Sequence, residues 1–286
     1  MSAGADRSRA PDGGARGPGD PDTPPVALTV AGSDSGGGAG VQADLKTFHA
    51  HHVFGTSAVT AVTVQDTRRV HAVQAVEPEI VAQQIRVVAE DLEPAACKSG
   101  MLANARVVRA VAGSLEETGL PNYVLDPVMV AASGDPLLEE RGVAAIRDEL
   151  VPRCTVVTPN LHETEMLLER SVEDEAGMRA AAGELVEMGA ASALVKGGHL
   201  TDDELVDVWS DGETTRVWRA TRIETGNSHG TGCTLSSAIA AGLALGWELQ
   251  EAVGGGLHFT RQALATAPGL GHGNGPLNHW TEPRRP

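Results

Sequence analysis

The stretch ETGNSHGTGCTLSSAIAAG, residues 224–242, combines the end of a predicted strand, a turn interrupted by glycines and a helix that begins near Gly232. Glycines at a helix N-terminus leave backbone N–H groups uncovered, and the helix dipole adds positive potential at the same point. Gly230 and Gly232 therefore predict a site for a phosphate-sized anion. Cys233 follows in the first helical turn, where the neighbouring N–H groups are predicted to lower the pKa of its thiol.

Composition and charge exclude several classes of partner. The chain has 286 residues, which fits one large α/β domain, and a formal net charge of −16, which argues against nucleic acid and anionic membranes as partners. Its three cysteines, Cys97, Cys154 and Cys233, form no CxxC pair, so neither a disulfide framework nor a zinc site is predicted. We expect a protein of the reducing cytoplasm.

Residues 1–25 are rich in Gly, Pro, Asp and Arg and contain no apolar run. A secretory signal requires an apolar centre and a transit peptide avoids acidic residues, so the sequence predicts a disordered tail. No later segment is apolar for long enough to span a membrane.

From Val26 onward, predicted strands and helices alternate along the chain. Such βα alternation predicts a mainly parallel sheet covered by helices on both faces, with ligands bound at the carboxyl ends of the strands. Residues 205–218 predict a β-hairpin that turns at Asp211-Gly212, and two helices are predicted over residues 231–245 and 248–265. The polar motifs follow predicted strands, so we expect them at one edge of the sheet.

Several of these motifs have two interpretations each. The glycine-rich segment 32–40 matches neither the P-loop nor a clean GxGxxG pattern, so a tight structural turn and a ligand loop both fit. Asn160 and Glu163 have the spacing of an N-cap with its capping box, and also that of an amide and a carboxylate directed at hydrated Mg²⁺. Asp126, at a strand end before proline, suits a metal or phosphate ligand or a simple turn. The segment VKGGH, residues 195–199, either holds a nucleotide or ends a strand.

The order of these motifs resembles that of the hydroxymethylpyrimidine/phosphomethylpyrimidine kinases of thiamine biosynthesis. The segments that carry the resemblance are AGSDSGGGAGVQADLKTF, KSGML, LDPVMVAASGDPLL, TPNLHETEMLL, VKGGH, HGTGCTLSSAIAAGLALG and GNGPLNH, between residues 26 and about 279. The resemblance implies a ribokinase-like domain over residues 26–286, with three α/β/α layers and a mainly parallel central sheet. It also implies ATP as phosphoryl donor, Mg²⁺ as cofactor, small-molecule substrates and a homodimer.

Matching the motifs position by position gives each candidate residue an implied role. Gly230, Gly232 and Cys233 correspond to the catalytic anion-hole turn, with the cysteine in the place of the catalytic residue. The implied substrate contacts are Gly32, Asp44, Gln65, Met101 and Val128; the nucleotide contacts are Lys196, Gly198 and Thr231; and the metal site contains Asp126, Asn160 and Glu163. The implied reaction is phosphorylation of 4-amino-5-hydroxymethyl-2-methylpyrimidine to its monophosphate and then to the diphosphate.

The chain departs from the common family pattern at three places. It has SDSGGG where many members have SDPSGG, which predicts a looser first loop, Ala132 where lysine is frequent, and His162 where proline is frequent. Two alternatives stay open at this point: a pyridoxal kinase of the same fold, which Gln65 and Met101 together disfavour, and a pyrimidine-binding protein without turnover.

Overall fold

A nine-stranded sheet forms the centre of the computed structural model, which describes residues 23–130, 137–198 and 204–285. The strand order is β3-β2-β1-β4-β5-β6-β7-β8-β9, and all pairs from β2 to β7 are parallel. The strands are β1 Val26–Asp34, β2 Phe54–Gln65, β3 Val70–Ala75, β4 Ala96–Ser99, β5 Tyr123–Leu125, β6 Val156–Val157, β7 Ala193–Lys196, β8 Glu204–Ser210 and β9 Thr215–Thr221.

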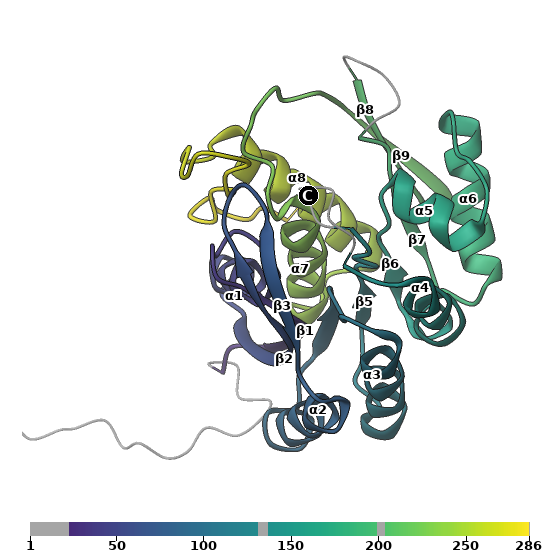
Figure 1. Cartoon of the computed structure of the whole chain (residues 1–286). Coiled ribbons are helices and arrows are strands. Elements are labelled where there is room, and N and C mark those ends of the chain that lie inside the picture. Colours follow the sequence, from purple (N-terminus) through teal and green to yellow (C-terminus); the bar gives the residue numbers. More distant parts are fainter. Residues whose placement is uncertain (1–22, 131–136, 199–203, 286) are drawn as a thin grey trace, which may run out of the picture.

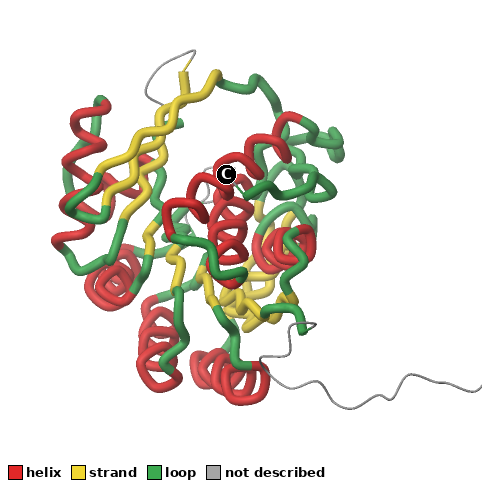
Figure 2. The backbone as a smooth tube through the Cα atoms, turned by 180° about the vertical axis from the view of Figure 1, so that it is seen from behind, coloured by secondary structure: helices red, strands yellow, loops and turns green. Residues whose placement is uncertain are grey.

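Helices cover both faces of the sheet, which gives three layers (Figure 1 and Figure 2). One face packs against α2 Pro78–Leu92, α3 Ala105–Thr118, α4 Glu140–Ala145, α5 Leu161–Leu168 and α6 Glu175–Glu187. The other packs against α1 Gly40–Ala50, α7 Thr231–Ala244 and α8 Leu249–Ala265. The predicted α/β/α architecture with a mainly parallel sheet is confirmed.

The sheet ends in antiparallel strands on both sides. β3 pairs with β2, and β8 and β9 form the predicted hairpin, in which Gly212 has φ +89° at the turn. The sequence patterns did not predict β3, whose residues are exposed for most of its length, or the short helix α4. Only an element with a clear apolar face carries a strong periodic pattern.

The predicted tail, residues 1–25, lies outside the described residues up to residue 22. At its end, the carbonyl of Pro25 accepts the N–H of Phe54 at 2.8 Å, which places Pro25 beside β2. Ala132 also lies outside the described residues. Within the described ranges, none of the helices combines the length and the apolar character that crossing a bilayer requires.

Candidate active site

Two glycine-containing turns that are far apart in the sequence meet at the carboxyl ends of the strands. The first follows β1, and the second leads into α7 through Gly230, which has φ +86°. A Cβ atom on Gly230 would overlap the carbonyl oxygen of Gly38, so only glycine allows this approach. The Asp34 carboxylate accepts the backbone N–H groups of Gly36 and Ala39 at 2.8 and 2.9 Å, which fixes the first turn.

The hydroxyl of Ser35, in the segment where the family commonly has proline, accepts the N–H of Gln65 at 2.8 Å and donates to its carbonyl at 2.7 Å. Proline has no hydroxyl to make these bonds. These two bonds tie the first turn to the end of β2.

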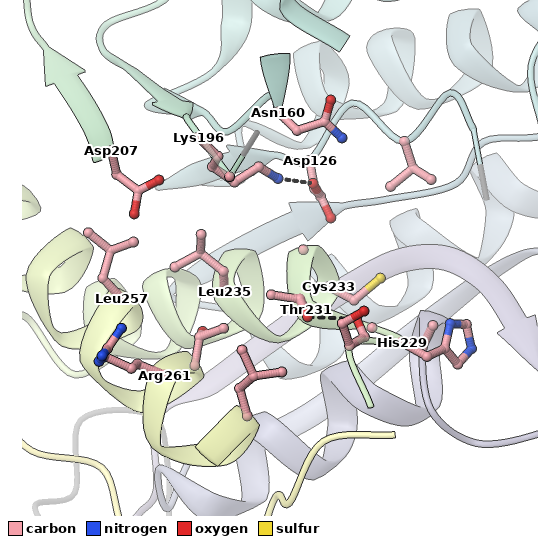
Figure 3. Close-up of a pocket in the computed structure, with 18 of the residues that line it drawn as sticks. Asp126, Asn160, Lys196, Asp207, His229, Thr231, Cys233, Leu235, Leu257 and Arg261 are labelled. Atoms are coloured by element: carbon pink, nitrogen blue, oxygen red, sulfur yellow. Dashed lines mark hydrogen bonds and ion pairs between the residues drawn. The ribbon is translucent and has the colours of Figure 1, made fainter. Parts of the chain in front are cut away.

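The two turns border a cavity of about 1240 Å³. Figure 3 shows Asp207, Lys196 and Asp126 along one wall, with Leu235 and Leu257 of helices α7 and α8 opposite them. All residues predicted for the site except Asp44 line this cavity: Gly32, Gln65, Met101, Asp126, Val128, Asn160, Glu163, Lys196, Gly198, Gly230, Thr231, Gly232 and Cys233. The structure thus brings together residues from seven segments of the chain.

Asp44, a predicted substrate contact, is not among the residues that line the cavity, and its side chain is fully buried. Both of its oxygens lie 3.0 Å from the ammonium of Lys98, which is also fully buried. The hydroxyls of Thr29 and Ser237 donate to the same carboxylate at 2.6 and 2.7 Å. Asp44 therefore joins α1, β1, β4 and α7 beneath the site.

Lys196 is the cation that faces the α7 N-terminus. Its ammonium lies 3.6 Å from Asp126 Oδ1, and a Cβ atom added to Gly232 would lie 3.4 Å from the same ammonium. Burial lowers the pKa of Lys196, but the charges of Asp126 and Glu163 outweigh burial and raise it above its ordinary value. Lys196 is therefore a permanent positive charge at this end of the cavity.

The capping-box interpretation of the Asn160–Glu163 motif is confirmed. It forms a capping box with Asn160: Glu163 Oε2 accepts the Asn160 N–H at 2.8 Å, and Asn160 Oδ1 accepts the Glu163 N–H at 2.9 Å. Burial, together with the charge of Asp126, raises the pKa of Glu163 to about 7 although Lys196 lowers it. A buried carboxyl with a raised pKa beside a second carboxylate is a site where a bound cation would stabilise the ionised form.

The residues predicted for the metal fit Mg²⁺, an ion that is held by one or two carboxylates and otherwise by water and substrate phosphates. Asp126 and Glu163 both line the cavity and supply the two carboxylates. Among the described residues no group of three acidic, histidine or cysteine side chains forms a closed metal cage. The amide oxygen of Asn160 already caps helix α5, so its contribution is to hold Glu163 in place.

Cys233 is a neutral thiol and not a partial thiolate as predicted. Burial raises its pKa to about 12, and Asp44 and Asp126 add to this effect, whereas Lys98 opposes it. Desolvation and the nearby carboxylates therefore outweigh the charge of Lys98. The neighbouring Thr231 is hydrogen-bonded within its own turn: its hydroxyl and its N–H both donate to the carbonyl of Ser228.

The sequence analysis assigned no role to several charged or polar residues of the cavity, among them Asp207 and His229. Asp207 on β8 is 5% exposed, and burial raises its pKa to about 6 although the Gly197 N–H and Lys196 lower it. His229, 7% exposed, places Nε2 at 2.9 Å from Asp34 Oδ2. Asp207 sits in a strand without a motif, and the partner of His229 lies 195 residues away, so only the fold reveals them.

A model of the family described as "Phosphomethylpyrimidine kinase" matches residues 34–278. The chain belongs to this family. The hydroxymethylpyrimidine/phosphomethylpyrimidine kinase of Rhizobium meliloti is 49% identical over 258 residues, which cover 89% of this chain and 97% of the relative. The enzyme of the same name from Escherichia coli is 43% identical over 257 residues, which cover 89% and 97%. The resemblance found in the motifs is thereby confirmed.

Solved structures agree with this assignment and confirm the ribokinase-like fold. Phosphomethylpyrimidine kinase from Clostridium difficile has a TM-score of 0.75 at 36% identity and covers 84% of this chain and 99% of its own. A pyridoxal kinase from Bacillus subtilis, solved as an ADP complex, has a TM-score of 0.83 at 35% identity and covers 90% and 98%. As a member of a kinase family, the chain uses ATP as phosphoryl donor and a small molecule as acceptor.

Proposed function

We propose that this chain phosphorylates the hydroxymethyl group of 4-amino-5-hydroxymethyl-2-methylpyrimidine and then converts the monophosphate to the diphosphate, within thiamine biosynthesis. One observation carries the proposal: a single cavity joins the predicted pyrimidine contacts to the α7 N-terminus and to the Asp126–Lys196 pair. An acceptor ring and a nucleotide triphosphate therefore fit into one continuous space.

The acceptor end of the cavity combines apolar and amide groups. Met101 is 8% exposed, and a Cβ atom on Gly32 would lie 2.8 Å from its sulfur, so glycine at position 32 allows Met101 to reach this wall. Met101 and Val128 offer apolar contact to a flat ring, and Gln65 offers an amide to its polar edge. This combination suits an aminopyrimidine.

The transfer end stabilises charge and orients the reactants. The first N–H groups of α7, at Gly232 and Cys233, have no acceptor within the helix, and the Lys196 ammonium lies close to Gly232. Phosphoryl transfer requires little covalent help and depends on positioning and charge stabilisation. Cys233 acts here as a neutral thiol that packs beside the acceptor oxygen, and Gly198 contributes backbone next to Lys196.

Mg²⁺ would be held by Asp126 and Glu163, with Asn160 fixing the orientation of Glu163. When bound, the ion neutralises negative charge on the transferring phosphate groups. Its charge would also favour the ionised form of Glu163, whose pKa is raised in the free protein.

Two further features of the proposal are a homodimer and a cytoplasmic location. Val62 and Val64 of β2 are 51% and 57% exposed, and together they offer an apolar strip for a second copy. The three thiols, Cys97, Cys154 and Cys233, are all free, which suits a reducing compartment. Light scattering on the purified protein tests the dimer, and Val64→Lys is expected to shift the mass toward that of one chain.

The reaction is tested by incubating the protein with ATP, Mg²⁺ and the aminopyrimidine alcohol, and following the products by ³¹P NMR. We expect the monophosphate first and the diphosphate later. A monophosphate that is never converted, even when it is supplied as the substrate, would exclude the second step.

A side activity on pyridoxal is a second candidate, and it rests on the similarity to a pyridoxal kinase at a TM-score of 0.83. The same assay with pyridoxal distinguishes the two acceptors. Formation of pyridoxal phosphate at a higher rate than either pyrimidine product would reverse the order of the two candidates.

A further inference from the structure

The main chain of Gln65 is held by two hydrogen bonds, and its side-chain amide lies between His229 and Thr63. Ser35 holds both the N–H and the carbonyl of Gln65, as described above. In the structure the amide nitrogen lies 3.4 Å from His229 Nε2 and the amide oxygen lies 3.3 Å from Thr63 Oγ1. The two ends of an amide have nearly the same shape, so counting donors and acceptors decides which end belongs where.

His229 Nε2 must carry a hydrogen. Its neighbour Asp34 accepts backbone N–H groups from Gly36 and Ala39 as well as the imidazole at 2.9 Å. Burial raises the pKa of Asp34, but the bond from His229 and these N–H groups outweigh burial and hold the pKa below its ordinary value. An ionised carboxylate only accepts, so Nε2 donates whether the ring is neutral or cationic. The hydrogen on Nε2 is directed at Asp34, and a ring nitrogen that carries a hydrogen has no lone pair to accept an amide N–H. The Gln65 atom that faces Nε2 at 3.4 Å is therefore the amide oxygen and not the amide nitrogen.

Thr63 leads to the same assignment from the opposite end of the amide. Its hydroxyl donates its single hydrogen to the carbonyl of Ser33 at 2.9 Å, the shorter of its two contacts. The Thr63 oxygen then accepts from Gln65, so the amide nitrogen belongs at this end. Both neighbours thus require the amide to be turned by about 180° from the placement that sets nitrogen toward His229.

We propose that Asp34, His229 and Thr63 are positioning residues that lock the Gln65 amide with its oxygen toward His229 and its nitrogen toward Thr63. The locked amide keeps one lone pair and one N–H free, and these form an acceptor beside a donor. Gln65, Thr63, Asp34 and His229 all line the cavity, and Figure 3 shows His229 next to Thr231 and Cys233 at the end of α7.

The ligand edge that complements this arrangement has an amino group next to a ring nitrogen acceptor, as a 4-aminopyrimidine has. The 4-oxo counterpart carries a carbonyl next to a ring N–H and reverses both positions. A free amide could rotate and serve either edge, whereas a locked amide rejects the 4-oxo edge because two buried groups would be mispaired. The inference rests on the proposed function and adds to it the cause of the selectivity.

The test is calorimetric titration, without ATP, of the 4-amino alcohol and its 4-oxo counterpart into the wild-type protein and four variants. Thr63→Val and His229→Leu remove the acceptor and the donor that orient the amide. Thr63→Ser and His229→Gln are matched controls that retain them, since the glutamine nitrogen reaches the position of Nε2.

We expect the wild-type protein to prefer the 4-amino alcohol by about 10²-fold or more, the scale of two mispaired buried groups. The preference falls by at least about tenfold in Thr63→Val and His229→Leu, and stays within about threefold of wild type in the controls. Thr63→Val does not touch Asp34, so it gives a result even if His229→Leu fails to fold.

An unchanged preference in Thr63→Val and His229→Leu, with equal loss of affinity for both alcohols, would show a purely structural role and overturn the inference. Equal binding of the two alcohols by the wild-type protein, or binding of neither, would overturn it as well. Because binding is measured without turnover, a protein that binds with the expected preference but transfers no phosphate would refute only the proposed function.

Discussion

Replacing Glu163 with glutamine separates the two interpretations of the Asn160–Glu163 motif. Glutamine also serves at this position of a capping box, so Glu163→Gln preserves the bond to the Asn160 N–H while it removes the titratable group. The two proteins then differ in how their stability responds to pH in the absence of Mg²⁺.

The magnitude follows from the raised pKa of Glu163. Burial and Asp126 move this pKa from 4.5 to about 7, so between these values the folded protein holds a proton that the unfolded chain has lost. The free energy of unfolding of the wild-type protein therefore falls as pH rises through this window and levels off above pH 7. Glu163→Gln has no titrating group at this position, so its free energy of unfolding does not show this decrease. At about 1.4 kcal/mol for each pKa difference of one, the advantage of Glu163→Gln grows by about 2 to 3 kcal/mol between pH 5 and pH 8.

Urea unfolding at pH 5 and pH 8 in the presence of EDTA measures this difference. Glu187→Gln, at an exposed position on α6, is the matched control and is expected to show no such growth. Added Mg²⁺ and ATP should narrow the difference at pH 8, because a bound cation stabilises the ionised carboxylate. If the free energies of unfolding of the wild type and Glu163→Gln differ by the same amount at pH 5 and pH 8, Glu163 is already ionised in the folded protein. This result would refute the reasoning.

Three further predictions concern the thiol, the buried ion pair and the tail. Cys233→Ala is expected to reduce the initial rate by less than the ~10²-fold that loss of a general base costs, with an unchanged pH profile between pH 6 and 9; a wild-type inflection that disappears in the variant would contradict the neutral thiol. Lys98→Met should lower the free energy of unfolding, measured in urea titrations, by about 3–5 kcal/mol, because it leaves the buried Asp44 carboxylate without its partner. The double variant Lys98→Met with Asp44→Leu should recover most of this loss. An equal loss in the single and the double variant would argue against the ion pair. A chain that begins at Pro25 should keep the Tm and turnover of the full chain, whereas a large loss of either would show that the tail docks on the fold.

The elements that position the site were predictable because each had its own pattern. The β-branched runs of β1 and β2, the apolar face of α2 and the glycine turn before α7 are local features. β3 escaped prediction because its residues are mostly exposed, and α4 because it has only six residues, with a glycine among them.

The sequence predicted which residues lie at the site but not their charge states. The role of Asp44 depends on Lys98, which lies 54 positions away and pairs with it only because β4 adjoins β1. The pKa of Cys233 depends on how deeply the fold buries it, and residue spacing contains no measure of burial. Sequence patterns thus identify residues that share a site, while the folded environment decides their charge.

The buried Asp44 carboxylate also has a consequence for the order in which the chain is synthesised. Thr29, Asp44 and Lys98 emerge from the ribosome early, but Ser237 completes their hydrogen bonds only after most of the chain has been made. Until α7 docks, the Asp44 carboxylate remains open to water on that side, and only α1 covers this face of the nascent sheet. The last segments to be translated therefore seal the core and build the anion-binding turn in the same event, so a truncated chain that cannot seal its core cannot form the site either.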